Sequence, residues 1–282
     1  MEEHITIYQK HSVSLHCQDT GITPQLRTFP RIKVALFDLY GTLFISGSGD
    51  IGLHQPGQKE ELLRTILREL FSLEPPSNLS LSDQLTAAIQ AKHLQIKSEL
   101  DIDYPEIDIR EQWQEILAPY IKLSAAQIET LAVTYEARTN PVWPMPNFQE
   151  FFTTLAEKNI ELGIISNAQF YTHALFPTFS PKHTPNFNPE LCLYSYQEQQ
   201  AKPGLHLYQK MASRLAQKDI KPEETLYLGN DMKNDIHPAN EVGFQTVLFA
   251  GDNRSYRPRP ERNYPPADAI ITDLLQFLEL LA

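Results

Sequence analysis

The sequence predicts an α/β fold in which helices cover both faces of a parallel sheet, with an all-helical segment inserted early in the chain. From residue 160 onward, short apolar runs alternate with helical periodicity, which is typical of parallel strands joined by helices. Between about residues 58 and 138, apolar residues recur at helical spacing and no strand pattern interrupts them. The chain has 282 residues and is 41% hydrophobic, so it can bury a large core in one or two domains.

The first 30 residues carry the weakest signal, and we assign them no function. Apolar and polar residues alternate there loosely, which permits short strands at Ile5, Ile7, Val13 and Leu15. A buried strand is expected at residues 32–37. The small residues from Ser46 to Asp50 then predict a flexible linker that leads into the inserted segment.

Four helices are expected in the inserted segment. Their apolar faces fall within residues 62–71, 85–100, 109–120 and 128–135. The proline-rich stretch from Thr139 to Pro146 cannot be helical and is interpreted as the linker that returns to the sheet.

The remainder of the chain supplies most of the predicted sheet. Strands are expected at residues 160–165, 191–194, 226–228, 246–249 and 269–271, and helices at about 205–217, 233–242 and 273–281. The predicted organisation is therefore an N-terminal extension at 1–30, a catalytic core at 31–46 and 141–282, and a helical cap at 47–140.

Composition narrows the classes of partner. A net charge of −11 argues against nucleic acid or an anionic membrane, because both require a basic surface. The two cysteines, Cys17 and Cys192, have no metal-type spacing and are expected to be reduced thiols. No signal peptide and no apolar run of about 18 residues is evident. We expect a cytoplasmic protein with a small-molecule substrate; the sequence leaves its oligomeric state open.

Asp38 is the most informative residue, because it follows the buried run at 34–37 directly. An Asp at the carboxyl end of a buried strand lies where open α/β sheets bind ligands. Gly41 permits a sharp turn that brings backbone amides close to an anion, and Thr42 follows it. The alternative is a strand-end Asp in an ordinary turn.

Two more strand ends carry polar residues of the same kind. Ser166 and Asn167 follow the strand at 160–165, where a hydroxyl and an amide can bind the oxygens of an anion. Lys202 precedes Pro203, which suits the first turn of a helix, so Lys202 is expected at the positive end of that helix. The ordinary alternative for a single lysine is a solvated surface position.

Asp231 and Asp235 lie at the next strand-to-helix junction, in the segment Gly-Asn-Asp-Met-Lys-Asn-Asp. Two carboxylates at this spacing can point into one site, and hard oxygen ligands suit Mg²⁺. N-capping of the following helix by one Asp is the alternative, and the second Asp is not explained by it.

The order of these four segments resembles the motif order of the haloacid dehalogenase-like (HAD) hydrolase superfamily. The resemblance covers residues 31–46 and 141–282, and the inserted helices resemble the helical cap of the family. It implies a Rossmann-like core with a parallel sheet and an inserted all-α cap domain. It also implies that Asp38 attacks the substrate and forms a covalent intermediate that water hydrolyses.

The resemblance also implies the roles of the other motif residues. The implied catalytic residues are Asp38, Tyr40 and Lys202. The implied substrate-binding residues are Gly41, Thr42, Ser166, Asn167 and Lys202. Magnesium would be held by Asp38, by the backbone carbonyl of Tyr40, and by Asp231 or Asp235, with Asn230 in one alignment taking the position of the usual first acid.

Tyr40 departs from the family's phosphatases, which have a second Asp at this position to protonate the leaving alcohol. A tyrosine has an ordinary pKa of about 10 and is a poor substitute. The segment Asp-Leu-Tyr-Gly-Thr-Leu resembles instead the 2-haloacid dehalogenase branch, whose halide leaving group needs neither a proton nor a metal. The acidic pair near residue 231 favours the phosphatase branch, so the two ends of the site point to different reactions.

The leading expectation is a Mg²⁺-dependent hydrolase of a small phosphorylated molecule. Either the leaving group of that substrate needs little protonation, or the cap or the substrate supplies the acid. His93 and Arg110 are candidates for such an acid within the cap, although a packed histidine and an ion-paired arginine are the simpler interpretations. The alternatives are a metal-independent 2-haloacid dehalogenase and a catalytically weak binding protein of the same fold.

Overall fold

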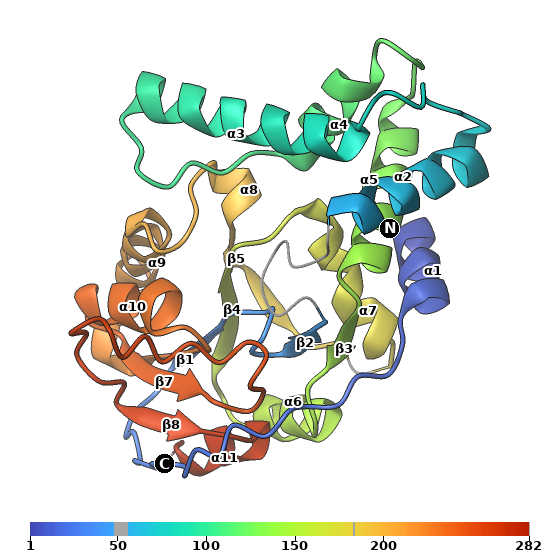
Figure 1. Cartoon of the computed structure of the whole chain (residues 1–282). Helices are drawn as coiled ribbons and strands as arrows, with labels where there is room; N and C mark the ends of the chain where they lie inside the picture. The colour runs from blue at the N-terminus through green and yellow to red at the C-terminus, as the bar shows by residue number, and fades with distance from the viewer. Residues whose placement is uncertain (48–55, 183, 282) are drawn as a thin grey trace.

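The core of the protein is a parallel sheet, seen in a computed structural model that describes residues 1–47, 56–182 and 184–281. Within these residues, six strands pair in the order β5-β4-β1-β6-β7-β8, and every pairing is parallel (Figure 1). The α/β fold is therefore as predicted. The strands are β1 (Val34–Phe37), β4 (Glu161–Ser166), β5 (Phe187–Tyr194), β6 (Thr225–Gly229), β7 (Gln245–Phe249) and β8 (Ala269–Ile271).

Helices bury both faces of the sheet, which explains why the strand at 34–37 is an unbroken apolar run. Leu36 on one face belongs to the cluster that includes Tyr208 of α9. Phe37 on the other face lies 5.9 Å from Phe151 of α6 and 5.6 Å from Phe277 of α11, measured between ring centroids. The helices around the sheet are α6 (Phe148–Ala156), α7 (Leu175–Phe179), α8 (Ser195–Glu198), α9 (His206–Ala216), α10 (His237–Glu241) and α11 (Leu274–Glu279).

The predicted core elements differ from the structure mainly at their boundaries. The strand expected at 191–194 begins four residues earlier, at Phe187. The helix expected at 233–242 consists of a π-helical turn, Met232–Ile236, followed by the short helix α10. Such turns occur within helices at functional sites.

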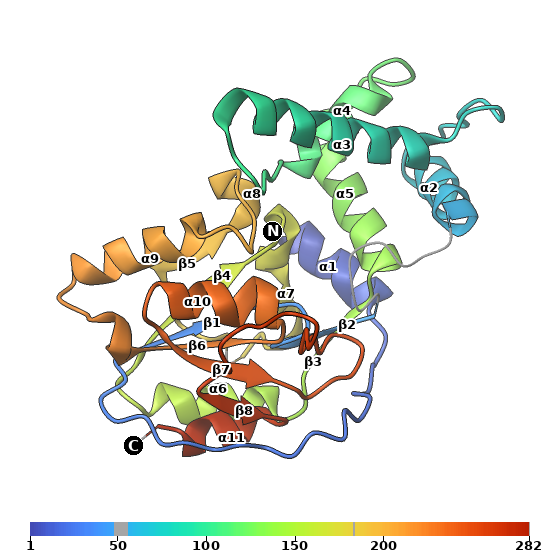
Figure 2. The same cartoon turned by 60° about the vertical axis from the view of Figure 1, so that its left-hand side comes forward.

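The named elements of the inserted segment are all helices in its described part, as predicted, and the segment stands above the sheet in Figures 1 and 2. The linker expected from Ser46 to Asp50 is described only as far as residue 47, and its remaining residues lie outside the described ranges. The division into core and cap at residues 47 and 140 stays a prediction. The inserted helices are α2 (Pro56–Phe71), α3 (Leu81–Leu100), α4 (Ile109–Leu117) and α5 (Ala125–Thr139).

The two ends of the inserted segment are joined by a small antiparallel ribbon that the sequence did not reveal. Strand β2 (Phe44–Ser46) pairs with β3 (Val142–Pro144). The Ser46 hydroxyl also donates to Asn140 Oδ1 at 2.8 Å. Residues 139–146 were expected to be a plain linker. They are not helical beyond Thr139, but the partner of β3 lies about 100 positions earlier, and local sequence pattern does not report such pairing.

The N-terminal extension corrects the expectation of short strands. Helix α1 (Glu2–His11) covers Ile5 and Ile7, and it buries Tyr8. It packs against α5 of the insertion and against α7 of the core (Figure 2). The chain then follows the core to the sheet edge, where the Gln25 amide donates to the Ile270 carbonyl. In the described part of the chain, no helix is both long and apolar enough to span a membrane.

Candidate active site

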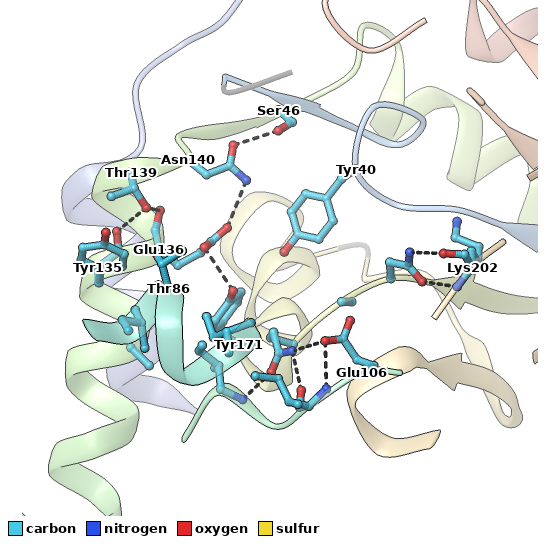
Figure 3. A pocket seen from close by; sticks show the side chains of 18 of the residues that line it. Tyr40, Ser46, Thr86, Glu106, Tyr135, Glu136, Thr139, Asn140, Tyr171 and Lys202 are labelled. Carbon is cyan, nitrogen blue, oxygen red and sulfur yellow. Dashed lines mark hydrogen bonds between the residues drawn. The ribbon is translucent and has the colours of Figure 1, made fainter. Parts of the chain in front are cut away.

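A cavity of about 790 Å³ is lined both by residues from the carboxyl ends of the strands and by residues of the inserted helices (Figure 3). We call Asp38, Lys202, Asp231 and Asp235, together with Ser166, which donates a hydrogen bond to Asp38, the floor of the site. We call the group from the inserted helices, His93, Trp113, Tyr135 and Glu136, its wall.

The floor is assembled by the strand order. Strand β1 lies between β4 and β6, and all three run in the same direction. Asp38 follows β1, Ser166 ends β4, and Asn230 follows β6, so their side chains meet at one edge of the sheet. This edge is the usual binding position in open α/β sheets. The structure therefore brings together the strand-end residues on which the sequence analysis depended.

Asp38 has two chemically different carboxylate oxygens. Oδ1 accepts hydrogen bonds from the Ser166 hydroxyl at 2.8 Å and from Lys202 Nζ at 2.7 Å. No side chain or amide of the described residues donates to Oδ2. Asp38 is buried in the cavity floor at 6% exposure. The carboxylate is thus held by one oxygen while the other remains available to a substrate.

Lys202 links the two carboxylates of the floor. Its Nζ lies 2.7 Å from Asp38 Oδ1 and 2.6 Å from Asp235 Oδ1. Burial lowers the pKa of Lys202, but the two carboxylates outweigh it, so the pKa is raised and the side chain stays charged. The expectation that Lys202 begins a helix is wrong, because α9 begins four residues later, at His206.

Asn167 holds the backbone of Lys202 from both sides. The Lys202 amide donates to Asn167 Oδ1 at 2.7 Å, and Asn167 Nδ2 donates to the Lys202 carbonyl at 3.1 Å. A direct contact between this amide and substrate was predicted. The contacts instead make Asn167 a positioning residue for Lys202, and the substrate-binding role stays a prediction.

Asp235 accepts four hydrogen bonds, which occupy both of its oxygens. Lys202 Nζ and the Tyr227 hydroxyl, at 3.0 Å, donate to Oδ1. The amides of Asn230 and Asp231 donate to Oδ2 at 3.1 and 2.9 Å. Burial raises the pKa of Asp235 to about 6, although Lys202 opposes the shift. The residue therefore serves as the buried counter-ion of Lys202.

Asp231 forms an ion pair with a different cation, Arg259. Arg259 donates to it through Nε, 3.2 Å from Oδ1, and through Nη2, 2.7 Å from Oδ2. The amide of Lys233 also donates to Oδ1 at 2.8 Å, so Asp231 caps the π-helical turn. For Asp231 the N-capping interpretation is therefore correct.

Magnesium does not fit these contacts. Both oxygens of Asp235 already accept hydrogen bonds and leave no lone pair for a metal ion, and Arg259 binds both oxygens of Asp231. Asn230, which one of the two alignments places at the position of the usual first acid, accepts from the Thr42 hydroxyl at 3.0 Å. No group of three or more Asp, Glu, His or Cys side chains suited to a metal occurs in the described ranges. Magnesium held by Asp38, Tyr40, Asp231 and Asp235 stays a prediction that the geometry does not support.

Tyr40 points into the cavity with a weakly acidic hydroxyl. Its oxygen lies 2.8 Å from Thr172 Oγ1. Burial, followed by the charge of Glu136, raises the pKa of the Tyr40 phenol well above its usual range. A phenol of this kind is a poor proton donor to a leaving group.

Gly41 and Thr42 support the loop rather than face the cavity. Gly41 has a φ of 83°, and a Cβ there would lie 2.6 Å from Ser255 Cβ, so both backbone and space require glycine. The Gly41 amide donates to the Phe44 carbonyl at 2.7 Å. Thr42 is fully buried and donates to Asn230. Their predicted contacts with substrate stay predictions.

Sequence reasoning missed Glu136, because a single acid beside an apolar helical stripe resembles a solvated face. In the structure it lines the cavity, where burial raises the pKa of its carboxyl. His93 also lines the cavity, and its Nε2 is buried with no hydrogen-bond partner among the described residues. Arg110 does not line it; the guanidinium donates to Asp108 and, at 2.7 Å, to Glu129. The ion-pair interpretation of Arg110 is therefore confirmed.

Comparisons with known proteins bear on this geometry. The family model described as haloacid dehalogenase-like hydrolase matches residues 90–249, more than half of the chain, a range that contains Ser166, Lys202, Asp231 and Asp235 but begins after Asp38. The Rhythmically expressed gene 2 protein of Drosophila melanogaster is 24% identical over an alignment of 166 residues that covers 54% of this chain. The match spans 62% of that relative's length.

Solved structures of low sequence identity share the fold. A 2-haloacid dehalogenase from Pseudomonas syringae pv. Tomato DC3000 aligns with a TM-score of 0.56 and 20% identity, covering 88% of this chain and 97% of that one. A HAD phosphatase from Thermococcus onnurineus aligns with a TM-score of 0.50 and 16% identity, with the same coverage of 88% and 97%. The fold is thus common to both kinds of enzyme.

Proposed function

Because the chain belongs to the haloacid dehalogenase-like hydrolase family, we propose that it hydrolyses a small substrate through a covalent intermediate on Asp38. The observation that carries the proposal is the asymmetry of the Asp38 carboxylate. Ser166 and Lys202 hold Oδ1, and Oδ2 accepts no hydrogen bond from the described residues. An oriented carboxylate of this kind can act as a nucleophile.

The arrangement around Asp38 supports substitution at carbon with a leaving group that departs as a stable anion, such as halide. Tyr40 replaces the acid that would protonate an alcohol, and its raised pKa makes it a weak donor. The acids at 231 and 235 are already neutralised by Arg259 and Lys202. The reaction supported best is therefore that of a metal-independent dehalogenase.

The proposed reaction has two balanced steps. Asp38 Oδ2 forms a bond to the substrate carbon as the bond to the leaving group breaks, and the leaving group keeps the electron pair. Water then attacks Cγ of the resulting ester, which releases the alcohol, returns the carboxylate and sends a proton to solvent. Lys202 and Ser166 stabilise negative charge that returns to Oδ1.

Magnesium-dependent hydrolysis of an acyl or aryl phosphate is the second candidate. The observation in its favour is that Asp231 and Asp235 lie beside Asp38 and Lys202 in the same cavity. Such substrates also release a weakly basic leaving group, which suits Tyr40. This reaction would require Arg259 to release Asp231, whereas the first candidate requires no change in the floor.

The test compares two substrates for wild type and Asp38→Asn. Purified protein is given 2-chloropropionate, with halide release as the readout, and p-nitrophenyl phosphate, each with Mg²⁺ and with chelator. We expect halide release that chelator leaves unchanged and that Asp38→Asn lowers by at least about 10³-fold. Asp83→Asn, which changes another aspartate of the cavity lining, is expected to keep most activity.

Turnover in ¹⁸O-water gives an independent readout of the covalent step. Water attacks Cγ of the ester, so mass spectrometry should find the heavy isotope in the peptide that contains Asp38. Activity that survives Asp38→Asn would contradict the proposal. Turnover of the aryl phosphate that depends on Mg²⁺ would favour the second candidate, and no turnover or label with either substrate would favour a binding protein.

A further inference from the structure

Glu136, on the wall, is a carboxylate that the proposed reaction does not use. The side chain of Asn140 donates to its Oε1 at 3.0 Å, and the hydroxyl of Tyr171 donates to its Oε2 at 3.1 Å. Both donors are neutral, and no cationic side chain of the described residues lies within ion-pair distance of Glu136. Each oxygen accepts one hydrogen bond, an arrangement that the ionised form can adopt. When Glu136 is ionised, it therefore has no counter-ion at ion-pair distance among the described residues.

Burying such a charge costs free energy unless a partner compensates it. Burial raises the pKa of Glu136, which reports this cost. Lys59 lines the same cavity from α2, and its charge opposes the rise in the pKa of Glu136, but it forms no ion pair with the carboxylate. A ligand cation would supply the missing partner.

The surroundings of Glu136 are aromatic. Tyr171 donates to Glu136 and Tyr135 precedes it on α5, and both line the cavity. The buried ring of Trp113 packs edge to face against Tyr135, with centroids 5.1 Å apart. Aromatic rings attract cations through their electron-rich faces, and with a carboxylate they form the usual enclosure for an organic ammonium group. A metal ion, which prefers several oxygen ligands, suits this lining less well.

The position of Glu136 separates it from the reacting atoms. Figure 3 shows the Tyr40 ring between Glu136 and Lys202, the floor residue that binds Asp38. A group bound to Glu136 therefore belongs to the part of the substrate remote from Asp38. Its contact would select the substrate without entering the bond-breaking step.

We propose that the wall, together with Tyr171, favours substrates that carry a protonated amine over similar uncharged ones, with Glu136 as the counter-ion and the rings of Tyr135 and Tyr171 beside it. Assigning this amine to the substrate rests on the proposed function. The binding of the amine does not, since it requires no turnover.

The test measures binding by isothermal titration calorimetry near neutral pH with benzylamine and with benzyl alcohol, which is similar in size but uncharged. Wild type is expected to bind benzylamine at least about tenfold more tightly, as a desolvated charge pair predicts. Glu136→Gln should reduce that preference to about twofold or less. Glu136→Asp should keep part of it, because the negative charge is retained.

Glu129→Gln is the matched control, since Glu129 lies on the same helix but pairs with Arg110 outside the cavity. It should leave the preference for benzylamine unchanged, and thermal unfolding of every variant confirms that each is folded. Equal affinity of wild type for both ligands, including no measurable binding of either, would overturn the proposal. So would an unchanged preference in Glu136→Gln.

These outcomes are separable from those of the proposed function. A preference for benzylamine that depends on Glu136, in a protein without Asp38-dependent turnover, would overturn the proposed reaction and leave the amine site standing. Turnover that depends on Asp38, without any preference for benzylamine, would support the proposed reaction and overturn the amine site.

Discussion

The floor and the wall of the cavity differ in the partners that their carboxylates have. On the floor, Lys202 lies at hydrogen-bonding distance from both Asp38 and Asp235, and neutral donors such as Ser166 and Tyr227 bind the same two carboxylates. On the wall, Glu136 has only neutral partners and His93 Nε2 has none among the described residues. Each carboxylate of the floor thus has a cationic partner, with Asp38 Oδ2 left open to a substrate, whereas Glu136 has no cationic partner among the described residues. This difference suits a floor that performs the chemistry and a wall that recognises the molecule on which it acts.

The largest expected effect comes from removing the charge at the centre of the floor. Lys202→Met leaves Asp38 and Asp235 buried without a cation, so we expect a loss of about 3–5 kcal/mol in the free energy of unfolding. Substrate turnover should fall by at least about 10²-fold, because charge returning to Asp38 loses its partner. Urea denaturation and steady-state kinetics measure the two effects.

Lys210→Met provides the control for this prediction. Lys210 pairs with Glu198 but is 38% exposed, so its loss should cost less than about 1 kcal/mol. If Lys202→Met were no more destabilising than this surface change, the two buried carboxylates of the floor would not depend on Lys202 for stability.

An intermediate effect is expected from the turn beneath Asp38. Gly41→Ala introduces a Cβ at a φ of 83° and 2.6 Å from Ser255 Cβ. We expect it to destabilise the protein by about 1–3 kcal/mol and to lower turnover, because the loop after Asp38 must shift. Gly21→Ala is the matched control, since Gly21 also has a positive φ, of 65°, but no atom lies within 4 Å of the added Cβ. A cost at Gly41 no larger than at Gly21 would show that the floor tolerates displacement.

The smallest expected effect concerns the wall and depends on pH. Burial raises the pKa of Glu136 above its value in the unfolded chain, so ionising it disfavours the folded state. This penalty is absent at low pH and grows as the pH rises above about 4.5, the ordinary value. The Tm of Glu136→Gln relative to wild type should therefore increase with pH, as measured by thermal melts across this range.

Glu224→Gln should show the opposite trend. Hydrogen bonds from the Lys221 backbone and from Lys33 lower the pKa of Glu224, so its ionised form stabilises the fold and the variant loses stability as the pH rises. A Glu136→Gln difference that did not change with pH would mean that the wall already compensates its charge.

Several elements show where local pattern was sufficient. Buried runs such as residues 226–228 and 269–271 predicted strands, and the structure has β6 and β8 there. Local pattern failed where a partner far along the chain decides the conformation. Strand β3 exists through its pairing with β2, and α1 is held by α5 and α7. The weak alternation in the first 30 residues had suggested strands instead.

The sequence by itself determined the family, the α/β architecture and the meeting of the strand-end residues near Asp38, because the carboxyl ends of parallel strands must converge on one edge. Only the tertiary structure decided which partner each carboxylate takes. Arg259 pairs with Asp231, which lies 28 residues away in the sequence, and Lys202 pairs with Asp235, which lies 33 residues away. Glu136 lines the cavity because of how α5 packs. These pairings depend on how distant segments pack, and composition and local periodicity carry no record of that.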